Sequence, residues 1–461
     1  MMSRSGTGRK TGALVAALLA ASALVPASAS AQDNASIEDR LDRLEAMMER
    51  LEARLDAAQS TSAEDAAMAQ EMRAAVAETR AVAEQQGQIE TRVAAMEEKD
   101  TQGFRIGGTQ FSLGGYVKMD AISQRTSGGQ VPGDSINRDF LIPSLIPVGG
   151  SASGWDTHFH ARQTRMILKT ATPVGDKTLG SHIEMDFLVT SGGDQRVSNS
   201  YVPRMRQAFL TYGGWTFGQA WSTFQNVGAL PESVDFVGVM PGTVFNRQAM
   251  IRYKTKSGIS IAVEQPETTI TNSVGGRILP SDDQMPDVIV RYDGPVTVAA
   301  IARQLNASDN VLASGSDSAW GYGVSVSGKI PIGEKDDFRF MGTVGDGLGR
   351  YIGANIVNDA AIDANGNLDP IFTYSGYAAF RHVWTDKMRS TIAGSYFKAD
   401  NPVSLTSGSP TDNVWNAMAN IIYSPVPKLD LGIEYMYAER ENEAGASGNL
   451  QKVQATAKYA F

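Results

Sequence analysis

Apolar and polar residues alternate with a period of two from Phe104 to the C-terminus. Leu429, Leu431, Ile433 and Tyr435, for example, alternate with polar or small residues. Because successive side chains of a β-strand point to opposite faces, this pattern predicts strands with one apolar and one polar face. No helical periodicity of useful length interrupts it, so residues 104–461 are predicted to be an all-β domain.

The connections between these strands are alternately short and long. Seven short turns are predicted at residues 173–177, 212–215, 256–258, 293–295, 331–335, 385–387 and 424–428. Eight Gly-, Ser-, Asn- and Asp-rich loops are predicted at residues 123–157, 190–202, 223–246, 266–286, 306–317, 345–370, 399–412 and 441–449. Seven turns and eight loops require sixteen antiparallel strands.

An even number of strands, with short turns on one side and long loops on the other, is typical of bacterial outer-membrane barrels. The mean hydropathy of −0.20 suits such a barrel, because every second residue faces water. A sheet in lipid must close, since an open edge would leave amides unpaired in hydrocarbon. Sixteen strands enclose an aqueous lumen. We therefore expect a transmembrane β-barrel in the outer membrane of a bacterium, with lipid around it.

The last strand adds a separate signal. Residues 450–461 alternate, with Val453, Ala455, Tyr459 and Phe461 on one face. An alternating strand that ends in an aromatic residue resembles the signal read by the outer-membrane barrel assembly machinery. Tyr459 and Phe461 are therefore the candidate assembly residues. The competing interpretation is a soluble β-domain whose last strand happens to end in Phe.

A different period precedes the barrel. Apolar residues at spacings of four and three form a heptad seam made of Ile37, Leu41, Leu44, Met48, Leu51 and Leu55. A second, poorer seam follows in an offset register, between residues 68 and 96. Residues 32–103 are therefore predicted to form an α-helical coiled-coil stalk in the periplasm, where it could contact peptidoglycan. An amphipathic helix packed on its own domain is the alternative. The seam favours self-association without deciding between dimer and trimer.

The N-terminus carries the features of an export signal. Arg4, Arg9 and Lys10 precede an apolar run at residues 12–25, and Ala29-Ser30-Ala31 provides a small-residue cleavage site. The run is too short to span a bilayer core of about 30 Å. Residues 1–31 are therefore predicted to be a cleaved signal peptide.

Composition excludes several function classes. There is no cysteine, which rules out disulfides and thiolate chemistry. A net charge of −9 argues against nucleic acid as a partner. The acidity lies mostly in residues 32–103, which hold 17 acids and 8 bases, whereas residues 104–461 hold 33 acids and 30 bases. The barrel is thus close to balanced.

Basic residues fall on the lumen face of several strands or at its margins. They are Arg162, Arg165, Arg204, Arg206, Arg247, Arg252, Lys254, Arg291, Arg303 and Arg381. A guanidinium is always charged and binds a carboxylate with two hydrogen bonds, so a row of them would favour anions. Alternatively, these cations pair with lumen acids. Arg165 has the opposite parity to Arg162, so it either faces outward or follows a bulge.

The loop at residues 224–246 is long and mixed in character. In large porins the third loop folds into the barrel, so Glu232 and Asp235 are the candidates for the acidic side of a constriction. An external loop cap is the alternative.

No enzyme motif is found. His158 and His160 share a strand face but lack a third ligand in the sequence, so a structural or lumen role is favoured over zinc. Neither a zinc-protease motif nor a serine-hydrolase elbow occurs, and no cofactor, metal or catalytic residue is predicted.

The chain resembles the DcaP-like outer-membrane porins. The resemblance is carried by residues 113–120, 139–143, 160–165, 183–187, 218–224, 230–236 and 247–252. It implies a sixteen-stranded homotrimer that passes dicarboxylates and related anions, preceded by a periplasmic coiled coil. Two other functions stay open. One is a non-conducting barrel that anchors a tethering or adhesive stalk, and the other is a barrel enzyme.

Overall fold

The computed structural model describes residues 103–188, 198–307, 317–363 and 365–461. The predicted signal peptide and the heptad seam lie outside these residues. Gly103, placed in the stalk by the sequence pattern, is the first residue of β1 (Gly103–Ile106), which pairs with the start of β2 (Thr109–Thr126). None of the helices in the described residues is long and apolar enough to cross a membrane.

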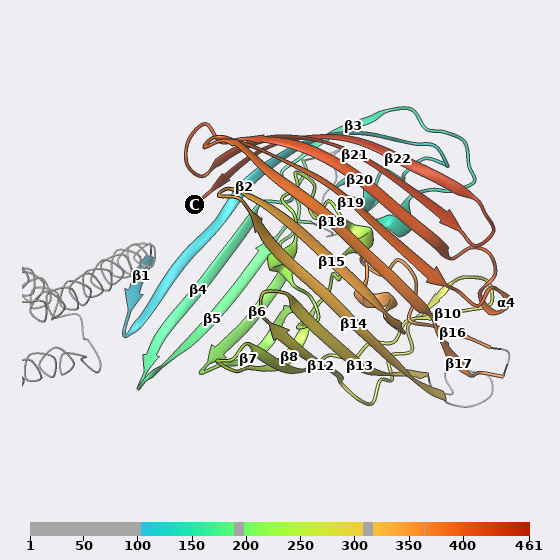
Figure 1. The fold of residues 1–461 in the computed structure, drawn as a ribbon, viewed down its shortest axis with the longest axis horizontal. Helices are drawn as coiled ribbons and strands as arrows, with labels where there is room; N and C mark the ends of the chain where they lie inside the picture. Colours follow the sequence, from blue (N-terminus) through green and yellow to red (C-terminus); the bar gives the residue numbers. More distant parts are fainter. Residues whose placement is uncertain (1–102, 189–197, 308–316, 364) are drawn as a thin grey trace, which may run out of the picture. The chain divides into compact units, whose positions relative to one another are not determined.

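Sixteen antiparallel strands form a closed barrel, as the turn pattern predicted (Figure 1). After β2, the wall strands are β4 (Arg165–Val174), β5 (Lys177–Asp186), β6 (Arg204–Tyr212), β7 (Trp215–Trp221), β8 (Arg247–Lys254), β9 (Ile259–Glu264), β12 (Asp287–Asp293), β13 (Thr297–Ala307), β14 (Asp317–Ile332), β15 (Asp336–Asp346), β18 (Phe372–Thr385), β19 (Met388–Asp400), β20 (Thr411–Tyr423), β21 (Leu429–Asn442) and β22 (Ser447–Ala460). The last strand closes on the first, with Tyr116 opposite Ala460 and Thr126 opposite Leu450.

Shorter elements lie within the loops. They are β3 (Asp156–His160), β10 (Ile270–Thr271), β11 (Arg277–Ile278), β16 (Ala360–Ile362), β17 (Leu368–Pro370), the 3₁₀ helices η1 (Ile136–Arg138), η2 (Pro143–Leu145), η3 (Val227–Ala229), η4 (Met240–Gly242) and η5 (Gly349–Tyr351), and the single turn α4 (Val403–Thr406). Strands β10, β11, β16 and β17 form a separate small sheet.

Strands β3 and β4 are two parts of one wall strand. Both pair with β2, β3 with its C-terminal half and β4 with its N-terminal half. Residues 161–164 interrupt them. This break shifts the parity of the residues in β4, so Arg165 faces inward like Arg162.

The alternation along each strand decides which side chains point outward from the barrel. On β2, Leu113, Val117 and Met119 are about half exposed, whereas Lys118 and Asp120, at alternate positions, are buried. Aromatic contacts gather at both strand ends, as in Trp215–Tyr253 near a short turn and Trp415–Tyr437 near the loops. An apolar band flanked by two aromatic belts is the surface that a bilayer requires.

The two-residue turn between β6 and β7 shows why the turns can be short. Gly213 and Gly214 both have positive φ, 55° and 97°. This is the backbone that connects twisted antiparallel strands most tightly, and it is nearly free of cost only for glycine.

The apolar core lies inside the ring of strands. Three loops contribute most of its loop residues, called L1 (residues 127–155), L3 (222–246) and L6 (347–371) here, and Leu188 comes from the loop after β5. Buried residues from L1, L3 and L6 form one cluster with inward side chains of the wall, and its members include Leu141, Ile146, Phe224, Val239, Met240, Val244, Leu348, Ile352, Met341, Tyr377, Phe397 and Met418.

Candidate pore constriction

L3 is bound to the inner wall through its backbone. The Glu434 carboxylate on β21 accepts hydrogen bonds from the backbone N–H of Val234 (2.8 Å) and Asp235 (3.2 Å) and from the Ser233 hydroxyl. The Lys118 ammonium on β2 donates to Val234 O at 2.8 Å. The loop therefore folds into the barrel, which is the arrangement predicted from its length and composition.

Asp235 is a buried anchor of this loop. Its side chain has no exposed surface and pairs with the Lys452 ammonium of β22. It also accepts hydrogen bonds from the N–H groups of Val237 and Gly238, both at 3.1 Å. Burial alone would raise the pKa of the Asp235 carboxyl, but Lys452 and these N–H groups outweigh it, so the pKa lies below its ordinary value.

Glu232 lies at the more open side of L3. Its carboxylate forms a two-pronged pair with Arg389 of β19, with both N–O distances 2.7 Å, and its side chain is 28% exposed. Arg389 also contacts Asp430 at 3.1 Å. Glu232 thus keeps one accessible edge, whereas Asp235 has none.

The far end of L3 touches the wall through two glycines. A Cβ on Gly242 would lie 2.1 Å from Gly376 O on β18, closer than any side chain allows. The amide of Asn416 on β20 donates to Gly238 O at 2.7 Å. L3 is therefore held against β18 and β20 as well as β21 and β22.

Four arginines lie together on the wall formed by β4, β6 and β8, around two carboxylates of β5. We call this group the basic cluster, and it consists of Arg165, Arg204, Arg206, Arg247, Glu184 and Asp186. Arg206 contacts Glu184 (2.5 Å) and Asp186 (2.8 Å), and Arg204 contacts Asp186 (2.9 Å). Arg165 contacts Glu184 at 3.3 Å.

Arg247 is the arginine of this cluster that lacks a carboxylate partner in the described part of the chain. Its guanidinium lies 4.8 Å from the centre of the Trp221 ring, and its Nη1 is buried without a hydrogen-bond partner among the described residues. Four cations thus face two anions, and the cluster carries an excess of positive charge. Sequence reasoning named all four arginines but not their arrangement.

The other predicted cations lie elsewhere on the inner wall. Arg291 and Lys254 both pair with Asp293, at 2.6 and 2.7 Å. Arg252 lies in the electrostatic field of Glu264 and Asp293.

Three more of these cations pair closely with acids. Arg381 pairs with Asp337 at 2.7 Å, beside the turn between β14 and β15, and Arg162 pairs with Asp139 of L1 at 2.5 Å. Arg303 has no exposed surface, because it lies between Asp287 (3.3 Å) and Asp359 (2.7 Å). Its assignment to the pore lining is corrected, since a side chain without accessible surface binds no ion from the lumen.

The sequence pattern missed that L1 and L6 also fold inward. L1 supplies Leu141 and Ile146 to the core, and L6 supplies Leu348 and Ile352. The usable signal was the apolar run in each loop, at residues 140–142 and around residues 351–357, which a solvent-exposed loop would not need.

The C-terminal strand has the predicted alternation. Tyr459 is 52% exposed and Phe461 is 39% exposed, and the Phe461 N–H donates to Gly115 O at 3.1 Å. Both rings lie on the outer face of the barrel.

Comparison with known proteins agrees with this geometry. The DcaP outer membrane protein family matches residues 143–461. The chain belongs to this family. A solved structure, the outer membrane channel DcaP of Acinetobacter baumannii, is 26% identical, with a TM-score of 0.65 over 78% of this chain and 99% of that one.

Other solved structures show lower similarity. The trimer form of OmpT from Vibrio cholerae is 12% identical over 77% of this chain and all of its own, with a TM-score of 0.46. An anion-selective porin from Comamonas acidovorans is 10% identical over the same shares, with a TM-score of 0.47. No curated protein matches the chain.

Family and fold support an outer-membrane location and a porin-type barrel, and they point to a channel rather than an enzyme. The resemblance noted from the sequence motifs is confirmed.

Proposed function

We propose that this DcaP-family barrel is a porin for passive diffusion of small hydrophilic solutes and that it favours anions such as dicarboxylates. The observation that carries the proposal is the excess positive charge of the basic cluster. Arg165 and Arg204 keep 18% and 20% of their side-chain surface, so their guanidiniums are accessible to a solute. A dicarboxylate carries two carboxylate groups, and each of them can accept two hydrogen bonds from one guanidinium.

L3 borders the proposed constriction and packs against the basic cluster, because the centre of its Phe236 ring lies 5.1 Å from the Arg206 guanidinium and 6.0 Å from that of Arg165. Its acids are largely neutralised, because Asp235 pairs with Lys452 and Glu232 pairs with Arg389. An anion that passes the exposed edges of Arg165 and Arg204 therefore meets weak repulsion from L3 and attraction from the wall. Glu232, with its exposed edge, is the acid of L3 that a solute would contact.

We further propose that three chains assemble as a homotrimer and that residues 32–103 form a periplasmic coiled-coil stalk after removal of residues 1–31. The heptad seam supports self-association. Contact of the stalk with peptidoglycan, and recognition of Tyr459 and Phe461 by the barrel assembly machinery, remain part of this proposal.

The apolar core inside the barrel favours a second candidate, a non-conducting barrel that anchors the stalk. L1, L3 and L6 fill part of the lumen with packed side chains. Single-channel recording in a planar bilayer separates the two functions. Open steps whose reversal potential in a KCl gradient indicates chloride preference, with succinate more permeant than a neutral solute of similar size, support the porin. A silent barrel supports the anchor, and cation selectivity contradicts the anion proposal.

A further inference from the structure

Three potential metal ligands meet where L1 contacts the barrel wall. His158 and His160 are two residues apart on β3, so both rings point inward, and Asp139 follows η1 in L1. The Asp139 Oδ1 atom lies 3.6 Å from His160 Nε2 and 4.0 Å from His158 Nε2. All three residues are buried. Sequence reasoning found no third ligand for the histidine pair, because Asp139 is 19 residues upstream of His158 in a loop.

The two imidazoles are buried with fewer hydrogen-bond partners than their ring nitrogens can use. Both ring nitrogens of His158 and Nε2 of His160 lack a hydrogen-bond partner in the described part of the chain, although the backbone of Arg138 lies near His158. The side chains of His158 and His160 are only 3% and 1% exposed. A buried polar nitrogen without a partner destabilises the folded state, so a bound group that uses these lone pairs would stabilise the fold.

We propose that Asp139, His158 and His160 bind a borderline divalent transition-metal ion, with Zn²⁺ as the reference ion. Two imidazoles and one carboxylate suit Zn²⁺ and its neighbours, whereas Ca²⁺ and Mg²⁺ prefer oxygen ligands alone. Ligand atoms of a tetrahedral zinc site lie about 3.3–3.5 Å apart, given bond lengths of about 2.0–2.1 Å. The separations from Asp139 Oδ1 to the two histidine nitrogens, 3.6 and 4.0 Å, therefore need to shorten by about 0.1–0.7 Å, and all three ligand atoms lie within 4.8 Å of one another. This site is independent of the proposed pore function.

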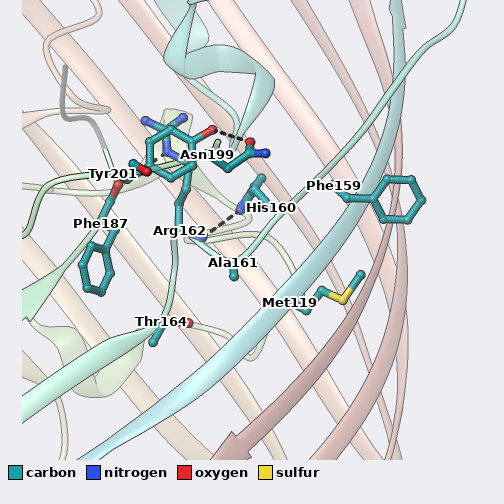
Figure 2. A pocket seen from close by; sticks show the side chains of 10 residues that line it. Met119, Phe159, His160, Ala161, Arg162, Thr164, Phe187, Asn199 and Tyr201 are labelled. Carbon is teal, nitrogen blue, oxygen red and sulfur yellow. Dashed lines mark hydrogen bonds between the residues drawn. The ribbon is translucent and has the colours of Figure 1, made fainter. Parts of the chain in front are cut away.

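A cavity of about 630 Å³ gives access to the site from one side. His160, Arg162, Asn199 and Tyr201 contribute to its lining (Figure 2). The Phe159 ring points away from His160 and Arg162, as alternation on β3 requires. A water molecule from this cavity can supply the fourth ligand.

Neighbouring cations limit the affinity and the choice of ion. Arg162 Nη1 binds the second Asp139 oxygen at 2.5 Å, and Lys118 and Lys452 lie near His160. The Arg162 N–H also donates to His160 Nδ1 at 3.3 Å, so ligation through Nε2 requires the His160 ring to turn away from this bond. These costs favour ions with a strong preference for imidazole.

Binding would fasten L1 to the wall next to L3. The Leu141 N–H, two residues after Asp139, donates to Asp235 Oδ2 at 3.3 Å. Asp235 is the buried anchor of L3. An ion on Asp139 would thus stabilise the contact between L1 and L3.

Isothermal titration of untagged full-length protein in detergent, stripped with chelator, tests the proposal. We expect one Zn²⁺ per chain and a higher unfolding temperature with Zn²⁺ than without it. The substitutions His158→Gln, His160→Gln and Asp139→Asn should each weaken binding tenfold or more, as expected for loss of a ligand. His382→Gln is the matched control, because His382 contacts Asp336 near a short turn and lies outside the cluster. It should bind Zn²⁺ like the wild type.

Heat-modifiable migration on a gel confirms that each variant is folded. Should a histidine variant fail to fold, X-ray absorption of the Zn²⁺-loaded wild type keeps the test decisive, since the proposal requires two imidazole ligands per ion. Failure of the wild type to bind Zn²⁺ stoichiometrically overturns the proposal. So does binding that survives in folded cluster variants, or a spectrum without imidazole ligands.

Discussion

Substitution of Arg247 by Gln tests whether the basic cluster sets ion selectivity. Arg247 has no carboxylate partner in the described residues, so the substitution removes one positive charge without releasing a buried acid. Glutamine keeps much of the volume and the packing against Trp221. The charge of the pore wall therefore changes with little change in shape.

Coulomb's law gives the size of the effect. A unit charge about 8 Å from a monovalent ion in water contributes about 0.5 kcal/mol. Screening at 0.1 M salt, where the Debye length is about 10 Å, reduces this to about 0.2 kcal/mol. Chloride occupancy then falls and potassium occupancy rises by about 1.5-fold each, so the permeability ratio changes about twofold in favour of potassium.

The assay is the reversal potential across a bilayer with a KCl gradient, measured near 0.1 M and again near 1 M salt. At about 1 M the Debye length is about 3 Å, and the difference between variant and wild type should nearly vanish. Lys335→Gln is the matched control, because it removes an exposed cation that pairs with Asp386 on neighbouring turns. An unchanged reversal potential in Arg247→Gln at low salt, or a shift equal to that of the control, refutes the reasoning.

Three further predictions concern how the loops are held. Gly242→Ala places a Cβ 2.1 Å from Gly376 O, so L3 moves off the wall into the lumen at a cost of about 1–3 kcal/mol, and single-channel conductance should fall; unchanged conductance would contradict the close contact. Because the pKa of Asp235 is lowered, its pairing with Lys452 is complete above pH of about 3.9 and is lost as pH falls further. The single-channel current of the wild type should therefore become noisy only in that acid range, whereas the current of Asp235→Asn should be noisy at neutral pH. Equal noise in the two proteins at neutral pH would count against Asp235 as an anchor of L3. Arg303→Met removes the ion-pair partner of buried Asp359 and leaves Asp287 with only its contact to Arg350 at 3.5 Å, so it should lower the free energy of unfolding by about 3–5 kcal/mol. Denaturant titration, followed by the gel band of the folded protein, measures this change. A stability equal to wild type would contradict the prediction.

The barrel could be predicted closely from the sequence because successive residues of each strand face lipid and the barrel interior in turn. Leu113, Val117 and Met119 alternate with Lys118 and Asp120, and lipid on one side leaves no other arrangement. Turn residues then set the strand count, as Gly213 and Gly214 do between β6 and β7. Both signals are local, and both act through backbone geometry.

The lumen was less predictable, because its contacts join residues far apart in the chain. Arg389 meets Glu232 across 157 positions, and Lys452 meets Asp235 across 217. Parity identified the inward-facing arginines, including Arg206 and Arg303, but not which of them an ion can reach. The meeting of Asp139 with His158 has the same origin, since a loop must fold back before the two can touch.

The shared core of L1, L3, L6 and the wall has a consequence for how such barrels diversify. Val239 and Met240 of L3 pack in one cluster with Tyr377 and Met418 of the wall. A loop transplanted from another family member would meet wall side chains shaped for a different partner and would leave voids or clashes. Changes in solute preference are therefore expected to arise through paired substitutions in loop and strand. An engineer who grafts a new L3 onto this barrel should transfer its facing residues on β18 and β20 as one unit.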